Sequence, residues 1–157
     1  MKRKDLIILW ETLIKIEKRP YILKFSYFIA KNKLFLKDEI TILNALKMPS
    51  KEYRDYDLKR IDLARKYADL DENSKAKIEN NSFVITEKIK EFETEFNKLK
   101  EEYKDHIKKF QDQISQFNSL IEKDYENELS TIELKDMPDS IEPDILETLL
   151  RLGLIKE

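Results

Sequence analysis

The feature that most constrains this chain is a stretch of about forty residues, from Thr86 to Tyr125, that contains neither glycine nor proline. Apolar side chains recur along it at steps of three and four residues, which is the periodicity of one face of an α-helix. These positions are Ile89, Phe92, Phe96, Leu99, Tyr103, Ile107, Phe110, Ile114, Phe117 and Ile121. The pattern predicts one long helix over residues 87–126.

A helix of that length would extend for about 60 Å, beyond the size of a compact small domain. Its apolar stripe can be covered in three ways: the helix folds back as a hairpin, it packs along the N-terminal helices, or it reaches into another subunit. The absence of glycine and proline argues against an internal turn. We therefore expect a homo-oligomer in which a second chain covers the distal part of the stripe.

Proline, glycine and clusters of turn-forming polar residues divide the rest of the chain into three N-terminal helices, a hairpin, a strand and a C-terminal helix. The N-terminal helices are predicted over residues 6–19, 21–46 and 51–68, the last with Ser50 as its N-cap and Leu58 on its inward side. A hairpin is expected over Ile78–Ile85 around an Asn80-Asn81 turn, and the strand Leu129–Leu134 would add to it. Thr86 is the expected cap of the long helix, and the last helix begins at Pro143 and ends at Gly153.

These patterns predict a mainly α protein, a helical bundle with one long helix (about 87–126) and a small β-hairpin or three-stranded sheet. We expect a single domain over residues 1–157. Its parts are a basic helical part (1–68), the hairpin (75–85), the long helix (86–126), and a strand plus C-terminal helix (128–157).

The composition excludes several kinds of chemistry. The chain has no cysteine, one histidine (His106) and one glycine (Gly153). Thiol catalysis, sites with several histidines and glycine-rich phosphate loops therefore have no residues to form them. We expect no catalytic residues, no metal site and no cofactor. His106 lies beside the apolar stripe, where a half-buried structural histidine is the simpler interpretation.

Charge is distributed unevenly along the sequence. Residues 1–66 hold 17 basic and 9 acidic residues, a balance of +8, and residues 67–157 hold the remaining 13 and 23, a balance of −10. Such halves can attract each other within one folded chain or between copies. The acidic half would repel a long polyanion, so nucleic acid is not favoured as a partner. No stretch reaches the roughly 18 uncharged apolar residues of a membrane span, so no membrane partner is expected.

The second predicted helix carries the most informative polar surface. Lys24, Tyr27 and Lys31 fall at i, i+3 and i+7 on one side with Asn32 adjoining, whereas Phe25, Ile29 and Leu36 occupy the inward side. Two ammonium groups beside a phenol suit a phosphate or carboxylate ligand, with an aromatic face for a base. Tyr53 and Arg54 on the third helix would enlarge this site. The alternative is that the lysines only keep an exposed helix solvated.

Several segments resemble a family of small uncharacterised proteins of tailed bacteriophages. The segments are Lys24–Asn32 (KFSYFIAKN), Tyr67–Asn73 (YADLDEN), Asn80-Asn81 and Phe92-Glu93-x-Glu95. Members commonly show a Lys-Phe-Ser-Tyr-x-x-Ala-Lys-Asn segment and a Tyr-Ala-x-Lys-Asp-Glu-Asn-Gly loop, from which this chain departs at Leu70 and Ser74. The resemblance implies phage origin and an accessory role at least as readily as a virion role, and it brings no activity with it.

Two functional hypotheses follow. The first is a non-enzymatic phage accessory protein in the host cytoplasm that sequesters an anionic, nucleotide-like signal of host defence. Its candidate ligand-binding residues are Lys24, Tyr27, Lys31, Asn32, Tyr53 and Arg54. The second is a phage structural or assembly protein that acts through helix-mediated oligomerisation.

Overall fold

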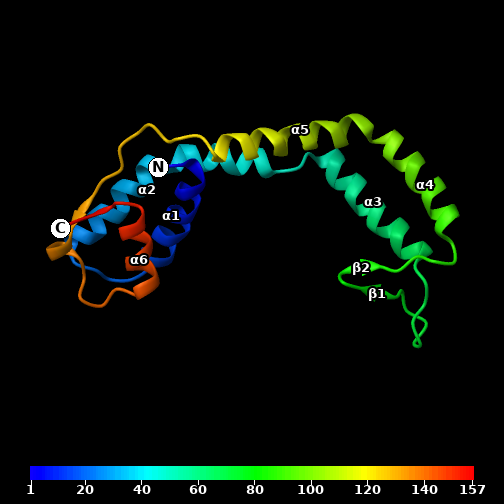
Figure 1. Cartoon of the computed structure of the whole chain (residues 1–157), viewed down its shortest axis with the longest axis horizontal. Helices are drawn as coiled ribbons and strands as arrows, with labels where there is room; N and C mark the ends of the chain where they lie inside the picture. Colours follow the sequence, from blue (N-terminus) through cyan, green and yellow to red (C-terminus); the bar gives the residue numbers. More distant parts are fainter. The chain divides into compact units, whose positions relative to one another are not determined.

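The computed structural model describes all residues 1–157 and is mainly α (Figure 1). The helices are α1 (Arg3–Ile16), α2 (Leu23–Lys47), α3 (Lys51–Tyr67), α4 (Ile89–Glu102), α5 (Lys104–Ile121) and α6 (Pro143–Arg151), with a 3₁₀ turn η1 (Leu134–Asp136). The strands are β1 (Ile78–Glu79), β2 (Ser82–Phe83), β3 (Ile132–Glu133) and β4 (Ile155–Lys156). The predicted fold class is confirmed, and none of the helices combines the length and apolar composition needed to cross a bilayer.

The chain divides into two compact units. The first unit comprises Met1–Lys47 and Ser115–Glu157, and the second comprises Met48–Ile114. The prediction of one domain over residues 1–157 stays a prediction.

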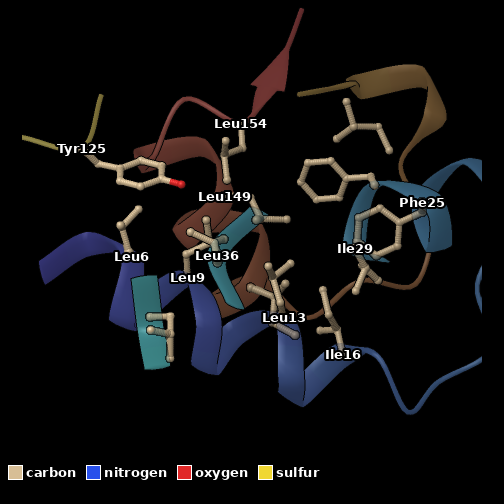
Figure 2. Packing of buried hydrophobic residues seen from close by; sticks show 14 of the residues in the cluster. Leu6, Leu9, Leu13, Ile16, Phe25, Ile29, Leu36, Tyr125, Leu149 and Leu154 are labelled. Carbon is tan, nitrogen blue, oxygen red and sulfur yellow. The ribbon is translucent and has the colours of Figure 1, made fainter. Parts of the chain in front are cut away.

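The first unit has a hydrophobic core built from α1, α2 and α6, whose apolar residues recur every three or four positions and so share one face of each helix. The fully buried residues of α1, α2 and α6 include Leu6, Leu9, Leu13, Ile16, Phe25, Leu36 and Leu149. Figure 2 shows these side chains gathered between α1, α2 and α6, with Tyr125 and Leu154 closing the cluster. The inward positions of α2 predicted from the sequence are confirmed. Phe117 and Ile121 of α5 pack against the edge of this core.

The uneven charge of the sequence is largely neutralised inside the first unit. Basic side chains of residues 1–47 form ion pairs with acidic side chains of residues 115–157. The pairs are Lys2 and Lys4 with Glu122, Lys15 with Asp144, Arg19 with Glu142, and Lys24 with Asp136. In one further pair the basic residue comes from the C-terminal part: Arg151 lies 4.0 Å from Asp5. Exposed pairs of this kind add little stability individually. Together, however, they show that basic and acidic parts of the sequence attract each other within one folded chain, which was one of the two alternatives for the uneven charge.

The second unit is held by an aromatic seam between α3 and the α4–α5 segment. Ser50 caps α3 by accepting a hydrogen bond from the Tyr53 N–H at 3.1 Å, as predicted. The Tyr53 and Phe110 ring centroids lie 4.2 Å apart, and those of Tyr56 and Tyr103 lie 5.8 Å apart. Only Tyr56 and Tyr103 are buried in this unit, and Leu58, predicted to face inward, is 64% exposed.

The prediction of one continuous helix over 87–126 is wrong in its details. The segment forms α4 and α5, which begin at Ile89, end at Ile121 and are separated by a break at Tyr103. The buried Tyr103 hydroxyl donates to Asp55 and accepts from Lys59 Nζ at 2.5 Å, so contacts with α3 hold the break. Because α3 of the same chain half-covers the stripe, a second chain is not needed for that part of it.

The predicted helix cap at Thr86 is also wrong. The Thr86 hydroxyl donates instead to Asp69 at 2.6 Å, and α4 begins three residues later. This contact ties the two ends of the hairpin region together. It leaves the N-terminus of α4 without a side-chain cap.

The two small sheets differ from the prediction in their pairing. The hairpin is confirmed: β1 and β2 are antiparallel around Asn80 and Asn81, whose φ angles are 48° and 61°. Left-handed conformations at both turn positions are what a two-residue hairpin turn requires. The third strand does not join the hairpin, because β3 pairs in parallel with β4, with Ile132 opposite Ile155.

Candidate anion-binding groove

An open groove of about 540 Å³ lies in the first unit. Its walls come from four parts of the chain that are distant in sequence: Met1, α2, the segment after α5, and the C-terminal segment after α6. The polar side chains that line it are Lys31, Tyr125, Asn127, Glu128, Ser130, Thr131 and Lys156, and apolar lining is supplied by Met1, Leu129, Leu152 and Leu154.

The buried Asn32 fixes one wall of the groove to α2. Its Nδ2 donates to the Ser130 carbonyl oxygen at 3.0 Å, and the Ser130 N–H donates to its Oδ1 at 2.8 Å. The amide thus pairs with both backbone groups of Ser130, as a neighbouring strand would. Since Asn32 is 0% exposed, this pairing is shielded from water.

The C-terminal wall is set by the end of α6 and by the β3–β4 pair. Gly153 adopts φ +68°, a left-handed conformation that costs glycine little and ends α6. The chain then reverses, and the Ile132 N–H donates to the Leu154 carbonyl at 2.9 Å. Lys156 in β4 is consequently placed in the groove lining together with Lys31 of α2.

The two lysines of the groove have no carboxylate within 4.0 Å, in contrast to most basic residues of this unit. The Lys31 ammonium lies 5.9 Å from the Tyr27 ring centroid and 5.7 Å from that of Phe35. Glu128 is the only acidic side chain in the lining. The groove therefore offers two ammonium groups and three side chains with hydroxyls (Tyr125, Ser130 and Thr131), which suits a small anion. The exposed rings of Tyr27 and Phe35 lie beside Lys31, outside the lining.

The structure separates the six predicted site residues. Lys31 lines the groove, whereas Lys24 pairs with Asp136 at 2.7 Å and Tyr27 is 64% exposed outside the lining. Asn32 was expected on the outer face but is fully buried, because its amide is used for Ser130. Its role is to build the groove.

The remaining two predicted residues, Tyr53 and Arg54, lie in the second unit. Tyr53 is half-buried against Phe110, and Arg54 is exposed on α3. Lys156, Ser130 and Thr131 could not be predicted, since nothing local in the chain indicates that residues 130 and 156 line the same groove as residue 31.

The densest titratable cluster of the second unit is Asp55, Lys59 and Tyr103. The hydrogen bond from Tyr103 lowers the pKa of Asp55, and the same bond raises the pKa of Tyr103. Hydrogen bonds to Tyr103 and Asp55 raise the pKa of Lys59. The pKa of each of the three groups therefore lies further from 7 than its ordinary value. Such a cluster is suited to holding α3 against the helix break and unsuited to proton transfer at neutral pH.

His106 is half-buried, with its ring centroid 6.4 Å from that of Tyr103. The structure contains no group of three or more histidine, aspartate or glutamate side chains placed to hold a metal ion. No family model, no curated protein and no solved structure matches this chain.

Proposed function

We propose that this protein is a non-enzymatic binding protein that captures a small, anionic, nucleotide-like ligand in the groove of the first unit. The observation that carries the proposal is the pair of lysines, Lys31 and Lys156, that line one groove without a carboxylate partner. An ammonium group that is not neutralised within the chain is available to a phosphate. The exposed rings of Tyr27 and Phe35 beside Lys31 offer faces on which a base can stack.

The resemblance to tailed-bacteriophage proteins supplies the biological setting of the proposal. In that setting the ligand is a nucleotide signal of host defence, and the protein acts in the host cytoplasm by sequestering it. Capture of this kind needs affinity and no chemistry.

The test is calorimetric titration of the protein with a panel of cyclic and linear nucleotides. We expect saturable binding of at least one of them, and about a tenfold or greater loss of affinity on Lys31→Ala or Lys156→Ala, because a hydrogen bond to a charged group contributes about 1.5–3 kcal/mol. Lys37→Ala is the matched control, since Lys37 is an exposed α2 lysine outside the groove. A folded protein that binds none of the panel contradicts the proposal.

A second candidate function is assembly of phage particles through the helices of the second unit. It is favoured by the aromatic seam, in which Phe92, Phe96 and Phe110 remain only half-buried. Mass spectrometry of purified particles separates the two functions, because an assembly component is retained in particles and a sequestering protein is not.

A further inference from the structure

Glu128 is the one residue of the groove lining whose charge opposes an anionic ligand. Its side chain is exposed, and its carboxylate forms no ion pair and accepts no hydrogen bond within the chain. A carboxylate repels a phosphate, which weakens binding of a bare anion. Its place in the lining is therefore favourable only if another part of the ligand donates hydrogen bonds to it.

The neighbouring Asn127 presents a carboxamide to the same groove. Its Nδ2 donates to the Tyr125 hydroxyl at 3.4 Å, and that hydroxyl donates to the Phe35 carbonyl oxygen at 3.4 Å. Tyr125 is only 8% exposed, so a buried group that is bonded to α2 orients the Asn127 side chain. Because a carboxamide has two N–H donors and one acceptor oxygen, Asn127 keeps one donor and its oxygen for a ligand.

Together the two side chains can place one N–H donor beside two carboxylate acceptors. Guanine carries the complementary groups along one edge: the O6 acceptor, the N1–H donor and the 2-amino donor. Adenine has an acceptor nitrogen in place of N1–H, which a carboxylate repels. Cytosine and uracil each have two acceptors and one donor along the same edge. Guanine is thus the only one of these bases with two adjacent donors for Glu128.

We propose that Asn127 and Glu128 select a guanine nucleotide. Asn127 Nδ2 donates to O6, and the Glu128 carboxylate accepts from N1–H and from the 2-amino group. The phosphate is bound by the ammonium groups of Lys31 and Lys156, which line the same groove. This inference rests on the proposed capture of a nucleotide in the groove and adds the identity of the base.

Calorimetric titration with GMP, inosine monophosphate (IMP) and AMP tests the base. IMP differs from GMP only in lacking the 2-amino group, and AMP lacks both O6 and N1–H. We expect GMP to bind at least tenfold more tightly than either, because the lost contacts are hydrogen bonds to a charged group.

The outcomes separate this inference from the proposed function. Equal affinities for the three nucleotides overturn the selection of guanine, and the proposed capture stands. A greater loss with 2′-deoxy-GMP than with IMP also overturns it, because the carboxylate would then bind the ribose. If no nucleotide binds the folded protein, both the proposed function and the inference are overturned.

Glu128→Gln gives a second test, because losing the charge and losing the acceptor have opposite effects on binding. Loss of the negative charge by itself strengthens binding of any phosphate. We expect GMP affinity instead to fall about tenfold and AMP affinity to rise, since the glutamine N–H can donate to the adenine ring nitrogen. Glu126→Gln removes the same charge from an exposed residue outside the lining and should leave the ratio of GMP to AMP affinity unchanged. A GMP affinity that rises in Glu128→Gln overturns the inference.

Asn127→Asp tests the other half of the site. Aspartate places an acceptor oxygen opposite O6, so GMP affinity should fall about tenfold. Asn118→Asp adds the same charge at an exposed residue of α5 outside the lining and should lower GMP affinity less than about twofold. Equal losses in the two variants overturn the role of Asn127.

Discussion

At the scale of single residues, Asn32 shows how one polar side chain organises the first unit. A fully buried amide is unfavourable unless each of its groups is paired, and here Ser130 provides both partners. The contact joins residues 98 positions apart in sequence. It therefore links α2 to the segment that precedes β3 and forms one wall of the groove.

Asn32→Leu should lower the free energy of unfolding by about 2 kcal/mol, because the Ser130 N–H and carbonyl lose their buried partners. Urea unfolding followed by Trp10 fluorescence measures this, since Trp10 is the only tryptophan and packs against the first unit's core. Asn44→Leu, at an exposed asparagine of the same helix, should change stability by less than about 0.5 kcal/mol. Equal effects of the two substitutions would mean that the amide contact contributes nothing.

At the scale of elements, the break between α4 and α5 is the main departure from the expected secondary structure. Residues on both sides of Tyr103 have helical periodicity, and neither glycine nor proline marks the position. The break is held by the side-chain contacts of Tyr103 with Asp55 and Lys59 on α3. Because Asp55 and Lys59 are more than forty residues away from Tyr103 in sequence, the spacing of apolar residues around Tyr103 cannot indicate this contact. That spacing alone therefore predicts a continuous helix.

The Tyr103 contact predicts that the stability of the second unit depends on pH in the acid range. Because the folded-state pKa of Asp55 lies below its ordinary value of 3.8, its contribution to stability is present above that value and is lost as the pH falls through the folded-state pKa. We expect the melting temperature, followed by far-UV circular dichroism, to fall as the pH drops below about 5 and on through 3.8, and to fall less in Tyr103→Phe. Tyr27→Phe, at an exposed tyrosine, should keep the full dependence. An unchanged dependence in Tyr103→Phe would contradict this role of the hydroxyl.

At the scale of the whole molecule, the two units differ in what stabilises them. The first unit has a buried core of leucine, isoleucine and phenylalanine side chains, whereas the second has an aromatic seam with two buried tyrosines. Free energy from apolar burial scales with the area removed from water. We therefore expect the second unit to open more readily than the first.

Phe25→Ala should cost about 3–5 kcal/mol, because Phe25 is 0% exposed in the core, whereas Phe96→Ala should cost less because Phe96 is half-buried. Trp10 fluorescence should register the first substitution strongly and the second weakly, since Trp10 belongs to the first unit. Far-UV circular dichroism during urea unfolding should register both. An equal shift of the Trp10 transition for both variants would contradict the separate stabilisation of the units.

The sequence by itself determined the helical class, the inward face of α2, the cap at Ser50, the Asn80-Asn81 turn and the end of α6 at Gly153. Each of these depends on residues within a few positions of one another, where spacing, hydrogen-bonding side chains and φ preferences act. Only the tertiary structure decided the break at Tyr103, the parallel pairing of β3 with β4, the burial of Asn32 and the placement of Lys31 and Lys156 in the lining of one groove. Those features arise from contacts between segments far apart in the chain, whose partners are fixed by packing of the whole unit.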